Sequence, residues 1–169
     1  WGISTVCFGL GYGDAFPDAS RAEVRFAPDG TLEVLTGAVE YGQGLLNMAA
    51  QVAAAELGMP LDRTRVIWAD TGRTPESGSS SASRQTYFTG NAIKRAAGEL
   101  KEELRDVAGT HLNVHPHEIV LADGHARTRF GEPRSVPIAD LVASGWQRGY
   151  ELCKRALYKP GTVCEDFET

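Results

Sequence analysis

The spacing of apolar side chains changes abruptly within one short stretch of this chain, and that change constrains the fold more than any other feature. Apolar and polar residues alternate over residues 22–26 and again over residues 32–36, a pattern typical of half-buried strands. The turn-forming residues 28–30 lie between them, so the two strands are predicted to form a hairpin. Over residues 45–57 the apolar positions instead recur about every 3.6 residues, which predicts a helix ended by Gly58 and Pro60.

A second amphipathic helix is predicted farther along the chain, over residues 84–108, with charged side chains opposite its apolar face. A short strand is predicted at residues 65–69. Weaker patterns predict strands at residues 2–10, 118–121, 126–130 and 150–158, and a small helix at residues 136–144. We therefore expect an α+β fold in which one mixed β-sheet carries two main amphipathic helices, all within a single domain of residues 1–169.

Composition excludes several classes of protein. The 42% hydrophobic and 23% charged residues are those of a soluble globular chain, and no apolar run is long enough to span a bilayer. A net charge of -5 argues against nucleic acid as a partner. Cys7, Cys153 and Cys164 are widely spaced, so we expect reduced thiols and a cytoplasmic protein rather than a zinc or iron–sulfur site. Because the first residue is Trp1 and not Met, we expect a segment of a longer chain.

The first segment with chemical potential joins the second strand of the hairpin to the first helix. Gly42 and Gly44 allow a tight turn and a close backbone approach to a ligand. The helix start behind them presents unpaired N–H groups that suit a phosphate, and the Gln43 amide suits the edge of a heterocycle. An ordinary strand-to-helix turn would have the same composition, so both interpretations stay open at this point.

The second segment, residues 70–83, is rich in Gly, Ser, Thr and Pro. Such a composition usually indicates a flexible linker, but here a strand and a helix anchor both ends. Arg84 lies at the start of that helix, where a cation is unfavourable unless an anion is near. A bound phosphate, Asp70 or Glu76 could each supply the anion. Together the two segments predict two helix N-termini that converge on one anionic ligand.

Three histidines near the end of the second helix, His111, His115 and His117, could suggest a metal site. Pro116 interrupts the helix between them, and no cysteine or paired acidic residues join them. We therefore interpret this region as a solvated helix-to-strand turn and predict no metal ligand in the chain.

Residues 37–44, Gly-Ala-Val-Glu-Tyr-Gly-Gln-Gly, resemble the Glu-x-Gly-Gln-Gly motif of the molybdenum hydroxylases. This family includes xanthine dehydrogenase, aldehyde oxidase and aerobic carbon monoxide dehydrogenase. Residues 51–58 resemble the helix that follows the motif, and Asp70-Thr71 resembles the end of the next strand. Residues 82–86 and 90–92 resemble the serine-rich loop and helix that surround the pterin.

The resemblance implies a molybdopterin cofactor carrying molybdenum, in some members extended as a cytosine dinucleotide. It implies hydroxylation of a purine, another N-heterocycle or an aldehyde, with water as the oxygen source. The implied partners are the remaining segments of the molybdenum domain and modules that carry iron–sulfur clusters and flavin. Carried over by position, the cofactor-binding residues would be Gly42, Gln43, Gly44, Ser80, Ser81, Ala82, Ser83 and Arg84.

One departure from the family limits what the chain can do alone. The family's general base is a glutamate in a glycine-rich motif near the end of the large subunit, and that motif is not found in this sequence. We therefore predict no catalytic residue in this chain, and we expect the isolated chain to be inactive and to hold no molybdenum. The alternative is a non-catalytic binding or assembly module with the same fold and no pterin.

Overall fold

Four strands form a mixed sheet in the computed structural model, which describes residues 1–12, 18–149 and 152–160. The order across the sheet is β3-β2-β1-β7, and β2 pairs antiparallel with β1 but parallel with β3. Strand β1 also pairs antiparallel with β7. The predicted hairpin and mixed sheet are confirmed, with strands at Ser20–Phe26 (β1), Leu32–Thr36 (β2), Thr64–Trp68 (β3) and Cys153–Tyr158 (β7).

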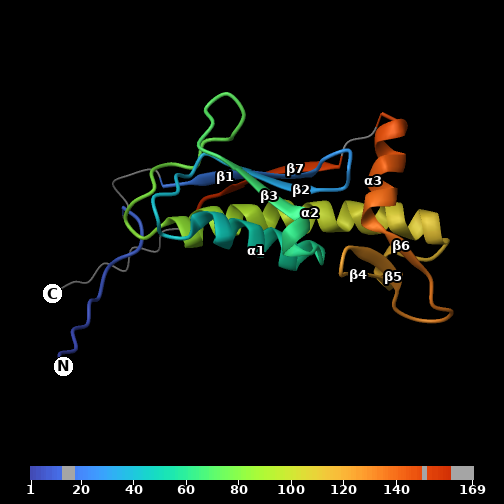
Figure 1. The fold of residues 1–169 in the computed structure, drawn as a ribbon, viewed down its shortest axis with the longest axis horizontal. Coiled ribbons are helices and arrows are strands. Elements are labelled where there is room, and N and C mark those ends of the chain that lie inside the picture. The colour runs from blue at the N-terminus through green and yellow to red at the C-terminus, as the bar shows by residue number, and fades with distance from the viewer. Residues whose placement is uncertain (13–17, 150–151, 161–169) are drawn as a thin grey trace.

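Helices α1 (Leu45–Leu57) and α2 (Gln85–Leu112) lie on one face of this sheet, as Figure 1 shows. The predicted bounds of α1 are confirmed. The helix ends at Gly58 with a φ of 62° and a backbone N–H bonded to the Ala54 carbonyl. A Cβ at Gly58 would lie 2.3 Å from the Leu121 carbonyl oxygen, so only glycine fits there.

Helix α2 is longer than predicted, because the sequence pattern placed its end at residue 108 and the helix continues to Leu112. It stops at Asn113, which takes a left-handed conformation with a φ of 54° and donates its N–H to the carbonyls of Gly109 and Thr110. Asparagine tolerates this conformation better than most residues, which explains the end point.

The second half of the chain forms a separate three-stranded sheet, whereas the sequence predicted only two of its strands, at residues 118–121 and 126–130, and a single sheet. Its order is β4-β5-β6, with both pairs antiparallel. The predicted helix start at residue 136 is wrong, because Val136 and Pro137 belong to β6. The elements are β4 (Ile119–Ala122), β5 (His125–Thr128), β6 (Ser135–Pro137) and α3 (Ile138–Gln147), with short 3-10 helices at Leu61–Arg63 and Pro116–Glu118. His115 caps the second 3-10 helix, which also contains His117, so these two histidines lie between α2 and β4, as predicted, whereas His111 belongs to the last turn of α2.

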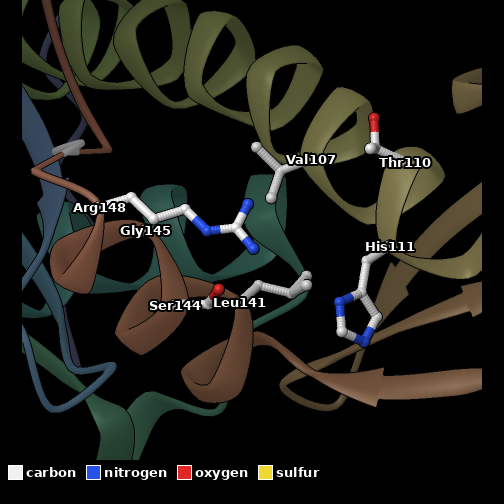
Figure 2. Close-up of a pocket in the computed structure, with 7 residues that line it drawn as sticks. All are labelled: Val107, Thr110, His111, Leu141, Ser144, Gly145 and Arg148. Atoms are coloured by element: carbon white, nitrogen blue, oxygen red, sulfur yellow. The ribbon is translucent and has the colours of Figure 1, made fainter.

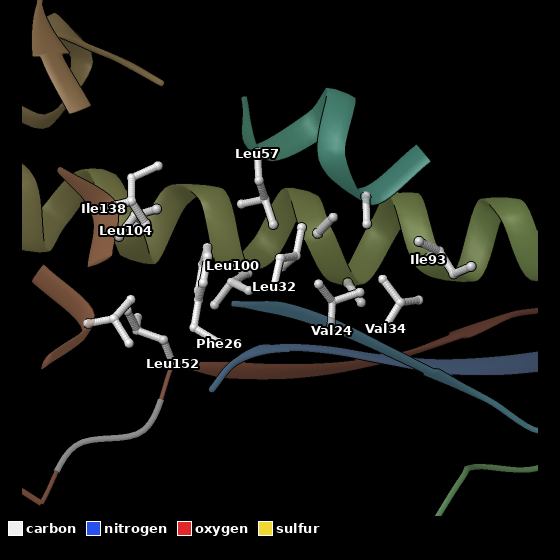
Figure 3. Packing of buried hydrophobic residues seen from close by; sticks show 14 of the residues in the cluster. Val24, Phe26, Leu32, Val34, Leu57, Ile93, Leu100, Leu104, Ile138 and Leu152 are labelled. Carbon is white, nitrogen blue, oxygen red and sulfur yellow. The ribbon is translucent and has the colours of Figure 1, made fainter. Parts of the chain in front are cut away.

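One continuous cluster of buried apolar side chains connects both halves of the molecule. Figure 3 shows side chains of β1 and β2 packed against one face of α2, with residues that precede β7 and begin α3 at one end. Fully burying each such side chain is worth about 1.5–3 kcal/mol. The cluster includes Val24, Phe26, Leu32, Val34, Leu57, Ile93, Leu100, Leu104, Ile138 and Leu152.

The face of the four-stranded sheet opposite the helices carries a chain of ion pairs across all four strands. Glu23 and Glu33 are almost fully buried there, and Arg25 bridges them at 3.2 and 2.8 Å. Arg155 of β7 pairs with Glu23, and Arg65 of β3 pairs with Glu33. Burial raises the pKa of Glu33, but its bonds to Arg65 and Arg25 lower it overall.

The predicted strand at residues 2–10 is wrong. Residues 1–12 contain no strand, and they extend away from the sheet beside the loops at one end of the molecule (Figure 1). Trp1, Ile3, Val6 and Phe8 are exposed. Alternating apolar residues favour an extended conformation, but a strand also needs a partner edge, and the described residues give this segment none.

Two sequence expectations concern the cysteines and the membrane. Cys7 and Cys153 carry free thiols, whereas Cys164 lies outside the described residues. Within the described part of the chain, no helix is both long and apolar enough to cross a bilayer.

Candidate functional site

The two segments singled out from the sequence meet at one edge of the four-stranded sheet. We call residues 40–44 the glycine loop and residues 77–83 the serine loop. The glycine loop follows the end of β2, and the serine loop lies on the connection that follows β3. These strands are parallel with Thr36 beside Trp68, so both connections leave the sheet at the same edge.

Direct hydrogen bonds join the two loops. The backbone N–H of Val39 donates to Ser80 Oγ at 2.8 Å, and the Tyr41 hydroxyl donates to the Ser80 carbonyl at 3.1 Å. From the first turn of α2, the Gln85 side-chain amide donates to the Ser79 carbonyl at 2.8 Å. The structure therefore brings together the residues that the sequence grouped, from segments about 40 positions apart in the chain.

A carboxylate inside the glycine loop organises its backbone. Glu40 Oε1 accepts hydrogen bonds from the N–H groups of Gly42 at 2.7 Å and Gly44 at 3.1 Å, and Oε2 accepts one from Leu46 at 3.1 Å. The bond from Leu46 lowers the pKa of Glu40 most; partial burial opposes the shift, and the other N–H groups add to it. Sequence analysis gave Glu40 no role, although an acidic residue just before a helix start is a recognisable signal.

The Gln43 amide closes the glycine loop and still faces solvent. Its Oε1 accepts from the Tyr41 N–H at 2.8 Å, and its Nε2 donates to the Val39 carbonyl at 2.8 Å. A primary amide has a second proton and a second lone pair, so Gln43 can offer one more donor and one more acceptor to a ligand. Gly42 and Gly44 have φ values of 109° and 83°, and a Cβ at either would meet no atom within 4 Å. That side of the loop is open.

The serine loop holds two consecutive non-glycine residues in the left-handed conformation. Ala82 has a φ of 50° and Ser83 a φ of 52°. Such residues cost about 1–3 kcal/mol each and persist only where their surroundings impose them. Here the N–H of Gly11 donates to the Ala82 carbonyl at 3.0 Å, and the N–H of Arg84 donates to the Ser81 carbonyl at 3.2 Å.

Arg84 supports the serine loop from within, since its side chain is 1% exposed. The guanidinium pairs with Asp18 at 2.5 Å and donates to the carbonyls of Ser77, Ser79 and Ala19 at 2.8, 2.9 and 2.7 Å. The anion that compensates the cation in this structure is therefore Asp18, and not either of the carboxylates considered from the sequence.

Tyr12 is a further member of the site that sequence reasoning missed. Its hydroxyl is hydrogen-bonded to Ser79 Oγ at 2.7 Å and also to Ser81 Oγ. The bond with Ser79 lowers the pKa of the Tyr12 phenol most, followed by the bond with Ser81. The two partners are 67 and 69 positions away in the chain, so no local pattern could have revealed them.

Exposed hydroxyl groups remain on the outer side of the serine loop. Ser81 and Ser83 are exposed, and Ser83 Oγ has no hydrogen-bond partner among the described residues. Across residues 1–12, 18–149 and 152–160, no three His, Cys, Asp or Glu side chains gather as a metal site. The exposed groups are thus the hydroxyls of the serine loop and the amide of Gln43, which suit a polar organic ligand.

A pocket of about 400 Å³ lies far from both loops, between the end of α2 and α3. Figure 2 shows the Arg148 side chain reaching from the end of α3 toward Val107 of α2, with His111 across the opening. None of the residues proposed from the sequence as a cofactor contact lines this pocket.

The model of one protein family, the molybdopterin cofactor-binding domain, matches residues 1–169. The chain belongs to this family. Among relatives of this domain, the xanthine dehydrogenase molybdenum-binding subunit of Escherichia coli is 33% identical over 128 residues, which cover 73% of this chain and 17% of that protein. The nicotine 6-hydroxylase large subunit of Paenarthrobacter nicotinovorans is 30% identical over 144 residues, covering 82% of this chain and 17% of the relative.

Solved structures of molybdenum hydroxylases, the family that the sequence motifs resemble, also match this fold. The quinoline 2-oxidoreductase of Pseudomonas putida matches this molybdopterin cofactor-binding domain with a TM-score of 0.74 and 26% identity, over 85% of this chain and 19% of that one. The carbon monoxide dehydrogenase of Oligotropha carboxidovorans gives 0.73 and 26%, over 86% of this chain and 18% of its own. The domain thus spans about a fifth of the length of these proteins.

Proposed function

We propose that this domain holds molybdopterin within the large subunit of a molybdenum hydroxylase, an oxidoreductase of the xanthine dehydrogenase and aldehyde oxidase type. The observation that carries the proposal is the meeting of the glycine and serine loops at one sheet edge, in a domain of a molybdopterin-binding family. The names of the relatives support the reaction class, since they include dehydrogenases, hydroxylases and oxidoreductases.

The exposed groups of both loops fit a pterin with a phosphate. The second donor and acceptor of Gln43 match the edge of a heterocycle, and the open sides of Gly42 and Gly44 allow close approach. On the serine loop, Ser80, Ser81, Ala82 and Ser83 form the surface that would face the cofactor. The guanidinium N–H groups of Arg84 donate to Asp18 and to backbone carbonyls, so we propose that Arg84 stabilises the conformation of this loop.

The bound cofactor would supply the redox chemistry, in which water provides the oxygen and the pterin passes on the electrons. The residues of this chain would bind and orient it, whereas the general base would come from outside the segment. By the names of the relatives, we propose an N-heterocycle or an aldehyde as substrate and a multi-subunit complex as the setting. The resemblance to the molybdenum hydroxylases adds modules that carry iron–sulfur clusters and flavin as the proposed partners. A cytosine dinucleotide form of the pterin and a cytoplasmic location, consistent with the free thiols, complete the proposal.

The test uses the full-length protein and two variants, Gln43→Ala and Ser83→Trp. Each should lower molybdenum and pterin content per folded molecule, because an unpaired polar group costs about 1–3 kcal/mol and a bulky side chain blocks approach to the loop. Matched controls are Gln51→Ala, an exposed glutamine of α1, and Ser135→Trp, an exposed serine of β6. Cofactor content and melting temperature are measured on the same samples.

Two outcomes would count against the proposal. Full cofactor content in both variants would remove Gln43 and Ser83 from the site. A full-length protein that binds no pterin, with variants that lose only thermal stability, would favour a non-catalytic binding or assembly module.

A further inference from the structure

The start of helix α1 lacks the usual ways of satisfying its backbone N–H groups. Its N-cap is Gly44, which has no side chain to accept a hydrogen bond, and its first turn contains no acidic residue. A helix start of this kind would normally leave its N–H groups to water or to a bound anion. Glu40 takes that place instead, from outside the helix.

The Glu40 carboxylate accepts hydrogen bonds from N–H groups both before and within the first turn of α1. One oxygen receives the N–H groups of Gly42 and Gly44, at 2.7 and 3.1 Å, and the other receives that of Leu46 at 3.1 Å. Gly42 and Gly44 both have positive φ values, which bend the backbone around the Glu40 carboxylate. This bend directs three N–H groups toward the same charged group.

We propose that Glu40 is a positioning residue: its carboxylate is the built-in anion of the α1 N-terminus, and it both fixes the glycine loop and excludes phosphate from this helix end. The importance of that loop rests on the function proposed above. The sequence predicted that the two helix starts converge on one anionic ligand. In this proposal they do not, because Glu40 already occupies the start of α1. The anionic part of a ligand meets the serine loop, while the glycine loop contributes the neutral amide of Gln43.

The connection between Glu40 and Gln43 is short. The amide oxygen of Gln43 accepts from the Tyr41 N–H, and its nitrogen donates to the Val39 carbonyl, so both partners flank Glu40 in the chain. Loss of the carboxylate frees the N–H groups on either side of Gln43 and leaves its amide without a fixed backbone. Glu40 therefore acts on a ligand through Gln43 and need not touch it.

Nuclear magnetic resonance on the isotope-labelled chain tests the first half of the proposal and requires no cofactor. As the pH falls, the amide chemical shifts of Gly42, Gly44 and Leu46 should change together as Glu40 is protonated. The three curves should share one midpoint, below the ordinary pKa range of a glutamate. The sign follows from the lowered pKa of Glu40: the ionised form is favoured in the fold, so the stabilisation is present at neutral pH and is lost as the pH falls through that pKa.

In Glu40→Gln the shared titration should disappear, and the side-chain amide signals of Gln43 should move toward those of the exposed Gln51. The control Glu99→Gln, at an exposed position of α2, should change neither. Separate midpoints for the three amides, or unchanged Gln43 signals in Glu40→Gln, would contradict the positioning role.

Addition of inorganic phosphate, followed through the same amide signals, tests whether Glu40 excludes phosphate from the start of α1. It should leave the amides of Gly42, Gly44 and Leu46 unshifted in the wild-type chain and should shift them in Glu40→Ala, where the helix start is vacant. Shifts in the wild type, or none in the variant, would overturn the exclusion of phosphate. A failure of cofactor binding in the full-length protein would leave all these readouts unaffected, so the two proposals fail separately.

Discussion

The glycine loop and the serine loop lie side by side but are held in different ways. Within the glycine loop, the bonds of Glu40 and Gln43 reach partners at most six positions away. The serine loop depends on distant residues, because Tyr12 binds it directly across 67 and 69 positions, and Asp18 pairs across 66 positions with Arg84, which holds the loop carbonyls. The backbone of the glycine loop is therefore organised mainly by local side chains, whereas the serine loop also needs supports that only the tertiary fold brings to it.

This difference predicts the largest loss of stability for Asp18→Asn. The variant leaves the buried Arg84 cation without its carboxylate, and breaking a buried pair by removing one partner costs about 3–5 kcal/mol. Urea denaturation measures the free energy of unfolding. Asp62→Asn, at an exposed aspartate, is the control and should change it by less than about 0.5 kcal/mol. An Asp18→Asn value near that of the control would mean that distant contacts do not hold the serine loop.

An intermediate effect is expected for Ser77→Ala at the base of the serine loop. The buried Ser77 hydroxyl is bonded to Thr36 Oγ1 at 2.9 Å and accepts from the Gly37 N–H at 2.9 Å. Its removal leaves buried polar groups unsatisfied at a cost of about 1–3 kcal/mol. The same denaturation measurement, with the exposed Ser135→Ala as control, checks this value. No difference between the two variants would show that the base of the loop is supported elsewhere.

Tyr12→Phe should change the overall stability least and should affect mainly the serine loop. The ring remains, but the bonds to the hydroxyls of Ser79 and Ser81 are lost. Hydrogen exchange should become faster at the backbone amides of the serine loop, with the melting temperature nearly unchanged. The amides of Gly42 and Gly44 serve as an internal reference, because Glu40 holds them independently. Equal acceleration in both loops would refute the distinction between them.

Local pattern predicted the elements that local interactions decide. The hairpin of β1 and β2 and the bounds of α1 followed from a change of period and from Gly58. The strands predicted at residues 118–121 and 126–130 correspond to β4 and β5, but β6 was missed because three residues are too few to establish a period. The separation of these strands from the main sheet was also missed, because strand pairing is not contained in a local pattern. The segment 2–10 has a strand-like sequence, but pairing depends on an edge that the pattern does not contain.

The same reasoning applies to the site. Small residues before two helix starts located both loops, since that signal is local. The partners of the serine loop, Tyr12 and Asp18, were not predictable because they are neighbours only in space. Arg84 showed the limit clearly: the sequence indicated that its charge needs an anion, but the partner was identified only by the fold.

Strand β7 closes the four-stranded sheet beside β1, although Ser20 and its partner Tyr158 are far apart in the sequence. During synthesis β1 therefore has one edge unpaired, and the part of α2 that contacts β7 stays uncovered, until residues 153–158 have been translated. Such surfaces promote aggregation of nascent chains. Asp18 and Ala19, which support the serine loop, lie just before β1. The residues that support the serine loop are thus joined directly to a strand whose sheet pairing is completed only after β7 has been translated.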